Sequence, residues 1–202
     1  MTQVLFDGTL SSDWRMTTIR NQPGRDNPGH FALEGDAIVS YPGTDLGLFW
    51  CAVPTPRDFL LELEWKLSAT GDNSGVFLRF PDPESKGYDN AAWVAITGGF
   101  EVQINEPGSP DGADMHTTGA IYSQASQTFT RVVANAPGTW NAYAIRVEGD
   151  VYTVSLNGSP VSRFVNTDAA RGLATTTTAP AYIGLQTHTG QVAFRNVRIT
   201  AL

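Results

Sequence analysis

The polar side chains of greatest chemical interest lie inside one of the clearest strand patterns of the chain, residues 100–105. Phe100, Val102 and Ile104 alternate there with Glu101, Gln103 and Asn105. Successive side chains of a strand point to opposite faces, so the apolar residues face a core and the polar ones share the other face. A carboxylate can transfer protons, and carboxamides both donate and accept hydrogen bonds. This face is therefore a candidate site for a ligand rich in hydroxyl groups.

The same alternation places further polar residues on the outward faces of other strand-like segments. If these segments lie side by side in a sheet, their outward side chains line one concave polar floor. The alternative is an ordinary solvated sheet face with scattered ion pairs. Strands do not favour glutamine and asparagine, so the recurrence of these residues supports the interpretation as a polar floor over that as a solvated face. The outward positions are Glu62, Glu64, Arg79, Glu101, Gln103, Gln186 and His188.

Aromatic side chains could add a stacking surface for a sugar ring to this floor. Phe77 faces outward in its own segment, and Trp93 and Trp140 belong to two other strand-like segments. For each tryptophan, packing in the core is the competing interpretation, because large aromatic side chains dominate protein cores.

Three histidines offer proton-transfer chemistry near neutral pH. His188 continues an outward-facing register and is a candidate general base, although an exposed, hydrogen-bonded histidine is an equally good interpretation. Asp111, Asp114 and His116 lie close together in one irregular segment and could share a metal ion. Segments of this composition are more often solvated turns.

Residues 101–105 also invite comparison with the E-x-D-x-E strand of retaining glucanases. Those enzymes need two carboxylates about 5 Å apart, one as nucleophile and one as acid/base. Gln103 and Asn105 stand at the second and third positions, and neither can attack or protonate as a carboxyl group can. The sequence therefore argues against double displacement on this strand.

The elements that must position these residues are short β-rich segments separated by Gly, Pro, Asn and Asp. They predict an all-β, antiparallel two-sheet sandwich or jelly roll in a single domain over residues 1–202. Asn157-Gly158 predicts a tight hairpin, and residues 166–171 predict one helical turn. Residues 9–30 and 105–120 are long irregular segments of the kind that carry function. The expected strands are Phe31–Ser40, Phe59–Leu67, Gly75–Phe80, Ala92–Ile96, Phe100–Asn105, Gly119–Tyr122, Trp140–Glu148, Val151–Leu156, Ala181–Thr187 and Val192–Thr200.

Composition restricts the partners. A net charge of −7 with scattered Lys and Arg argues against nucleic acid and anionic membranes. No apolar stretch approaches the roughly 18 residues that cross a bilayer. The single cysteine, Cys51, permits no internal disulfide and is expected to be buried. We expect a cytoplasmic protein, because no signal peptide is visible, or a secreted one if a leader was removed. The oligomeric state is left open.

Nine segments, taken in order, resemble successive motifs of the 3-keto-disaccharide hydrolase family (DUF1080), and together they cover nearly the whole chain. This resemblance implies a concanavalin A-like lectin/glucanase sandwich that acts on glycosides oxidised at C3. The segments are Leu5–Leu10 with Trp14, Asp58–Trp65, Asn73–Arg79, Gly99–Ile104, Thr118–Tyr122, Gly138–Asn141, Leu156–Gly158, Gly184–Gln186 and Phe194–Ile199.

The implied chemistry explains why one strand carboxylate suffices. A C3 ketone makes the C2 hydrogen acidic, so one base can remove it and the C1 substituent can leave by β-elimination, with or without later hydration. We expect His188 or Glu101 as the base, Glu64 as an alternative acid and Arg79 as the donor to the enolate oxygen. A divalent metal such as Ca²⁺ could replace Arg79; no other cofactor is expected. The expected substrate-binding residues are Gln103, Asn73, Gln186, Tyr122, Trp140 and Phe77.

Two points keep a second interpretation open. The family often has Asp where this chain has Asn105, which removes a carboxylate from that position, although Glu106 follows directly. The same sandwich also hosts lectins, and a fold does not determine chemistry. A non-catalytic carbohydrate-binding module is therefore the alternative to a hydrolase or lyase.

Overall fold

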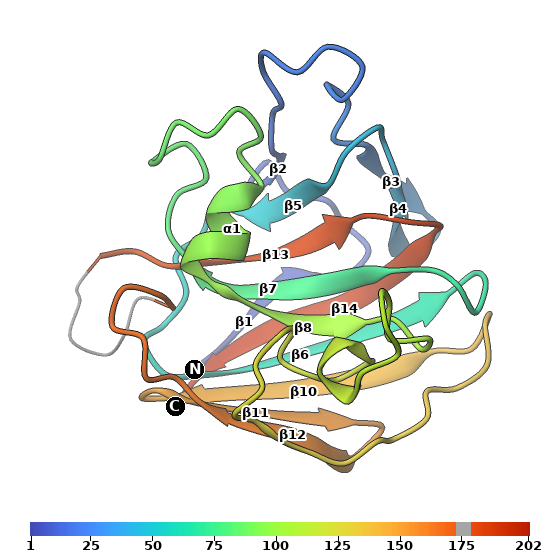
Figure 1. Ribbon diagram of the computed structural model, residues 1–202, viewed down its shortest axis with the longest axis vertical. Helices are drawn as coiled ribbons and strands as arrows, with labels where there is room; N and C mark the ends of the chain where they lie inside the picture. Colours follow the sequence, from blue (N-terminus) through green and yellow to red (C-terminus); the bar gives the residue numbers. More distant parts are fainter. Residues whose placement is uncertain (173–178) are drawn as a thin grey trace.

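The computed structural model describes residues 1–172 and 179–202. In this part of the chain, two antiparallel β-sheets are accompanied by one short α-helix and one short 3₁₀ helix (Figure 1). The elements in chain order are β1 (Thr2–Phe6), β2 (Trp14–Met16), β3 (His30–Glu34), β4 (Ala37–Tyr41), β5 (Gly47–Cys51), β6 (Phe59–Leu67), β7 (Ser74–Phe80), α1 (Trp93–Gly98), β8 (Phe100–Ile104), η1 (Asp114–His116), β9 (Thr128–Phe129), β10 (Asn141–Glu148), β11 (Val151–Leu156), β12 (Ser159–Val165), β13 (Tyr182–Thr187) and β14 (Val192–Ala201).

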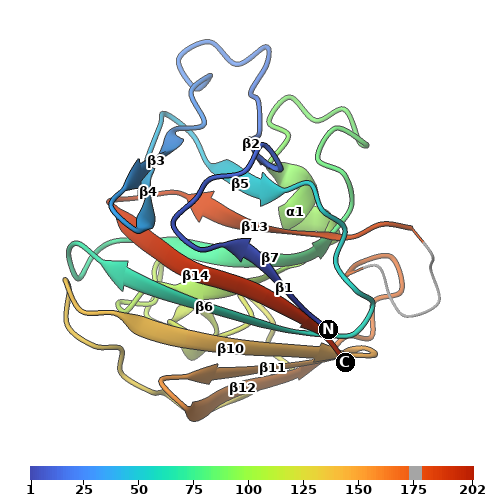
Figure 2. The ribbon, with the colours of Figure 1, turned by 180° about the vertical axis from the view of Figure 1, so that it is seen from behind.

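The two sheets differ in size. The large sheet has the order β3-β4-β14-β6-β10-β11-β12-β9, with β1 also paired to β14. The small sheet has the order β2-β5-β13-β7-β8. Figure 2 views the large sheet from outside, and both chain termini lie close together beside it. This arrangement confirms the predicted antiparallel sandwich.

The hydrophobic core lies between the sheets and follows directly from strand alternation. In β6, Phe59, Leu61, Leu63 and Trp65 are at most 2% exposed, and the residues between them are partly exposed. Burying each such side chain contributes roughly 1.5–3 kcal/mol. The inner residues of all the larger strands join this one cluster, so the core fixes which face of each strand is turned outward.

The outer face of the small sheet is covered over part of its length by α1, which lies in front of β7 and β13 in Figure 1. Ala92 and Ala95 pack there against Phe77 and Phe80 of β7. The prediction of a strand over Ala92–Ile96 was wrong. Residues three apart lie on the same side of a helix, so the small apolar residues of this segment face the sheet, and Trp93 remains exposed.

A bulge near the end of β7 reverses the alternation that the sequence suggests. Leu78 pairs with Ile183 and Phe80 pairs with Tyr182, so Arg79 is an extra residue without a partner on β13. Its φ of 51° is in the left-handed region. An inserted residue of this kind shifts the following side chains to the opposite face. Phe80 therefore lies under α1, and Arg79 turns into the sandwich, opposite to expectation.

Other differences from the expected elements are local. The segment Phe31–Ser40 is two strands, β3 and β4, because a turn with Gly35 at a φ of 64° divides it. Gly119–Tyr122 forms only an isolated bridge to β8. Residues 166–171 form a hydrogen-bonded turn rather than a helix. The strands β1, β2, β5 and β9 were not predicted.

The hairpin predicted at Asn157-Gly158 is confirmed. The two residues have φ values of 50° and 81° and connect β11 to β12, as a two-residue turn of this type requires. Among the residues that the structure describes, no helix is long and apolar enough to cross a membrane.

Candidate functional site

The outer face of the small sheet carries a group of polar residues beside the part that α1 covers. Strand register sets them in two rows. Gly75 of β7 pairs with Gln103 of β8, and the register in which Leu185 of β13 pairs with Val76 continues this row to Gln186. In the next row, Gly184 and Phe77 lead to Glu101. We call Asn73, Gly75, Glu101, Gln103 and Gln186 the polar floor.

Gly75 gives Glu101 room to lie flat on this floor. A Cβ atom on Gly75 would overlap the Oε1 atom of Glu101 and lie 2.7 Å from its Cγ and Cδ atoms. The carboxyl group thus occupies the space that a side chain at position 75 would need. A glycine inside a strand commonly marks such a close approach.

Four oxygen atoms of the floor are buried and have no hydrogen-bond partner: Asn73 Oδ1, Glu101 Oε1, Gln103 Oε1 and Gln186 Oε1. Leaving one buried polar group unpaired costs about 1–3 kcal/mol. Native proteins seldom gather such atoms at one place without a functional reason. A ligand that donates several hydroxyl groups would satisfy these acceptors.

Glu101 is the ionisable group at the centre of the floor and is 8% exposed. Burial raises the pKa of its carboxyl group to about 8, because the charged form loses its hydration. At neutral pH the carboxyl group is therefore mostly protonated and able to donate a proton.

Residues 119–122 extend the floor beyond β8. Tyr122 N–H donates a hydrogen bond to Glu101 O at 2.8 Å, and Gln103 N–H donates to Ala120 O at 2.9 Å. With Val102 bridged to Ile121, this register sets Tyr122 directly beside Glu101. Burial, followed by the charge of Glu101, raises the pKa of the Tyr122 phenol.

Next to Tyr122 lies a chain of three hydrogen-bonded side chains from the long segment between β8 and β9. His116 Nδ1 is 2.7 Å from Asp111 Oδ1, and His116 Nε2 is 3.0 Å from Ser123 Oγ. The His116 ring lies 4.9 Å from the Tyr122 ring, centroid to centroid. His116 is buried, whereas Ser123 is exposed.

The predicted base His188 lies at the far end of the same face. It follows Gly184 by four residues, and Gly184 shares a row with Glu101 two strands away. Two strand spacings are about 10 Å and four residues of strand about 13 Å, so the main-chain positions are roughly 16 Å apart. Partial loss of hydration lowers the pKa of His188, and the charge of Asp45 opposes this shift.

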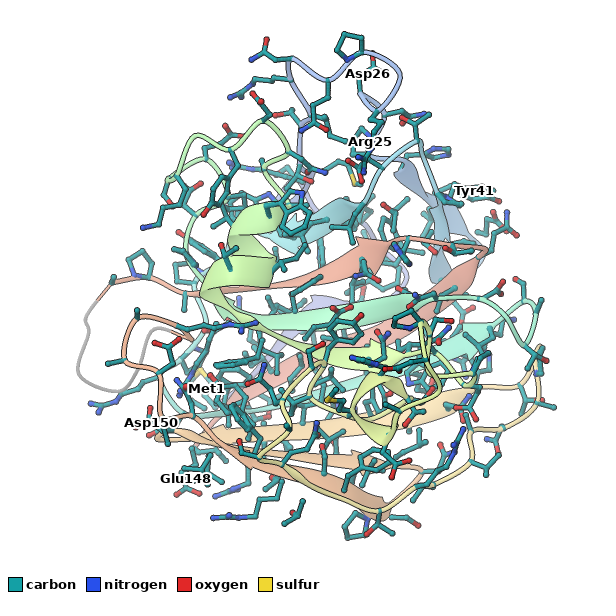
Figure 3. All side chains as sticks on the ribbon, in the orientation of Figure 1. Met1, Arg25, Asp26, Tyr41, Glu148 and Asp150 are labelled. Atoms are coloured by element: carbon teal, nitrogen blue, oxygen red, sulfur yellow. The ribbon has the colours of Figure 1, made fainter. Side chains whose placement is uncertain are left out.

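The structure does not bring Arg79 to the floor. The bulge turns its guanidinium inward, where it donates to the Arg57 carbonyl, to Gly149 O at 2.5 Å and to Asp58 Oδ1 at 3.4 Å. Gly149 belongs to the turn between Glu148 and Asp150, which Figure 3 labels near Met1. Arg79 is 2% exposed; it closes this end of the sandwich and cannot reach a ligand on the floor.

Glu64 and Trp140 belong to the opposite side of the molecule, the outer face of the large sheet. Glu64 Oε2 accepts hydrogen bonds from Arg195 Nε at 2.6 Å and from Asn196 Nδ2 at 2.8 Å. The Trp140 ring contacts the charged groups of Arg195 and Lys66, which lie 4.1 and 4.7 Å from its centroid. The predictions that these residues act with Glu101 were wrong, because alternation defines faces without saying to which sheet a strand belongs.

Phe77 and Asn105 lie near the floor but have structural surroundings. Phe77 is 1% exposed beneath α1, so it offers no stacking surface. Asn105 Nδ2 donates to Asp72 O at 3.2 Å, and Asn105 Oδ1 accepts from Ser109 N–H at 2.7 Å. An aspartate could not make both bonds, which explains why an amide suits this position.

The alternative that Asp111, Asp114 and His116 share a metal ion has no matching arrangement. Within residues 1–172 and 179–202, no three His, Cys, Asp or Glu side chains come together as a metal site. Asp111 instead accepts a hydrogen bond from the Ala113 N–H and contacts His116, and these interactions lower the pKa of its carboxyl group.

Two residues of this region were missed by sequence reasoning. Gly75 could have been suspected, since a glycine within a strand pattern signals close contact. Ser123 gave no such signal, because only the folded segment brings it to His116.

The chain folds as an antiparallel two-sheet β-sandwich of the concanavalin A-like lectin/glucanase class, and the polar floor lies on the outer face of its small sheet. The chain belongs to the family of 3-keto-alpha-glucoside-1,2-lyase-like domains, whose family model matches residues 1–200. This confirms the resemblance described above. No curated protein has a sequence that matches this chain.

Solved structures agree with this class. Two from Parabacteroides distasonis ATCC 8503, both provisionally assigned as glycosyl hydrolases, are 20% and 22% identical with TM-scores of 0.73 and 0.71. Each covers the whole of this chain, matched over 94% and 100% of its own length. The exoplasmic/lumenal domain of VIP36, bound to Ca²⁺ and Man3GlcNAc, is 12% identical with a TM-score of 0.58, over 98% of this chain and 88% of its own. These likenesses concern the fold.

Proposed function

We propose that the polar floor binds a glycoside oxidised at C3 and that the protein cleaves it by elimination across C1 and C2. The observation that carries this proposal is Glu101, a buried carboxyl group with a pKa of about 8 beside amide oxygens that lack partners. Family membership supports the same chemistry, since the family is described as 1,2-lyase-like.

In this reaction Glu101 is the general acid. After a base removes the C2 proton, the electron pair forms an enolate with the C3 oxygen. The C1–O bond then breaks, and the leaving oxygen takes the proton of Glu101. A group that is protonated at neutral pH suits this role, and general acids typically contribute 10²–10⁴-fold to a rate. The product is an enone, which water can hydrate afterwards.

The amides of the floor orient the sugar. Buried oxygens of Asn73, Gln103 and Gln186 accept hydrogen bonds from sugar hydroxyl groups, and the amide nitrogens donate to the C3 oxygen. Because Arg79 is held inside the sandwich, the donors to the enolate oxygen come from these amides and from Tyr122.

The test uses a 3-keto-disaccharide and its unoxidised parent, each incubated with the protein with and without a chelator. We expect release of the leaving sugar and an enone chromophore from the keto form alone. The Glu101→Gln variant should lose at least about 100-fold in rate, whereas the matched Glu62→Gln variant, on the large sheet, should keep full activity. Equal cleavage of both sugars would refute elimination. Loss of activity in the presence of the chelator would add a metal ion to the mechanism.

A carbohydrate-binding module is the second candidate. Unpaired acceptors would serve binding equally well, and a sandwich of this fold binds Man3GlcNAc in VIP36. Saturable binding of the keto sugar without turnover, lost in Gln103→Leu, would favour this module over the enzyme.

A further inference from the structure

The proposed reaction needs a base for the C2 proton, and two histidines compete for that role. His188 lies at the far end of the same sheet face, and its main-chain position is roughly 16 Å from that of Glu101. His116 packs on Tyr122, the residue directly beside Glu101. Proximity to Glu101 therefore favours His116.

The hydrogen bonds of His116 also prepare it for proton transfer. Asp111 occupies Nδ1 at 2.7 Å, which makes Nδ1 the protonated nitrogen and leaves Nε2 as an acceptor toward the Ser123 hydroxyl at 3.0 Å. A carboxylate that fixes the tautomer in this way lets the imidazole take a proton from the serine. The buried ring is thus connected to the surface through Ser123.

A similar chain of Ser, His and Asp activates nucleophiles in acyl transfer, but the backbone here argues against that chemistry. Acyl transfer needs free N–H groups beside the serine to hold an oxyanion. The Ser123 N–H donates to Met115 O at 3.0 Å, and the Gln124 N–H donates to Ile121 O at 3.1 Å. With both N–H groups occupied, the chain is suited to proton transfer alone.

We propose that Ser123, His116 and Asp111 form the proton relay on the base side of the site, an inference that rests on the proposed function. Ser123 Oγ takes the C2 proton while its own proton moves to His116 Nε2. The C2–H electron pair enters the enolate, and the positive imidazole is balanced by Asp111. After Glu101 protonates the leaving group, water at the exposed Ser123 removes the extra proton, and Glu101 regains one from solvent.

Ser123 is held in an uncommon backbone conformation that fits this role. Its φ is 58°, in the left-handed region that non-glycine residues seldom adopt. Such conformations persist where the surroundings enforce them, often at functional sites. Here the bond from Ser123 N–H to Met115 O and the bond to His116 fix the hydroxyl toward the ring.

The experiment isolates the base step from cleavage. A 3-keto-1-deoxy sugar lacks the exocyclic C1 substituent that leaves in the reaction. No sugar is then released, and the base step appears as exchange of the C2 proton, which NMR in D₂O follows as incorporation of deuterium. We expect Ser123→Ala to slow this exchange at least about 100-fold. The neighbouring Ser126→Ala variant should exchange like the wild type. Asp111→Asn, at a positioning residue, should lower the saturated exchange rate and leave half-saturation unchanged.

The outcomes separate this inference from the proposed function. If the wild type cleaves 3-keto-disaccharides and Ser123→Ala exchanges at the wild-type rate, the relay is wrong and the proposed function stands. Loss of exchange in His188→Gln alone would likewise overturn the relay in favour of His188. If the wild type neither cleaves nor exchanges, both proposals fall together.

Discussion

Replacing Glu101 with glutamine keeps the size of the side chain and removes its ionisation, and it should change how stability depends on pH. The folded protein holds the proton of Glu101 up to a pKa of about 8, whereas the unfolded chain releases it near 4.5. The group therefore stabilises the fold fully below pH 4.5, and this contribution is lost as pH rises toward 8.

The size of the effect follows from these two values. Each pH unit between them changes the free energy of unfolding by about 1.4 kcal/mol. Between pH 5 and pH 8 the wild type should lose about 3.5 kcal/mol through this group. Glutamine does not titrate, so the Glu101→Gln variant should become more stable relative to the wild type as pH rises.

Urea unfolding of both proteins at pH 5, 6, 7 and 8 measures this difference. Subtracting one curve from the other removes the titrations that the two proteins share. A difference that stays within about 0.5 kcal/mol across this range would refute the argument, because Glu101 would then ionise in the fold as easily as in the unfolded chain.

Two further predictions concern the surroundings of the floor. Gly75→Ala should preserve the fold, since the side chain of Glu101 can swing aside, but the displaced carboxyl group should lower the cleavage rate about 100-fold. Circular dichroism checks the fold and steady-state kinetics checks the rate. Unchanged kinetics would contradict the role of Gly75. Arg79→Met should lower the free energy of unfolding by about 2–4 kcal/mol, because the carbonyls of Arg57 and Gly149 lose their buried donor. Urea unfolding measures this loss. A change in the cleavage rate of the folded fraction would instead show that Arg79 takes part in the reaction.

The sandwich was predictable because long alternating segments such as Phe59–Leu67 define a buried face by themselves. Helix α1 was not, since Ala92–Ile96 is a short apolar run whose periodicity is ambiguous. The bulge at Arg79 was equally hidden, because nothing in residues 75–80 marks the extra residue, yet the bulge reverses the directions of Arg79 and Phe80. Pairing with β13, far along the chain, imposes it.

The candidate site was predictable only along single strands. Glu101, Gln103 and Gln186 were placed on outward faces, and the fold sets them on one sheet. Glu64 was placed on an outward face as well, but that face belongs to the other sheet. Strand periodicity carries no information on sheet membership, and Ser123 is defined by contacts between loop residues that no pattern describes.

The outer faces of the two sheets lie on opposite sides of the sandwich, so the protein can be attached to a solid support through one face without covering the other. The ion pairs of Glu62 and Glu64 lie on the large sheet, away from the floor. Cys51 is the chain's single cysteine and is buried, and burial raises the pKa of its thiol. A cysteine introduced for the exposed Arg163 on β12 would give one reactive thiol. Coupling the protein to a support through this thiol would leave the small sheet, which carries the polar floor, on the side away from the support.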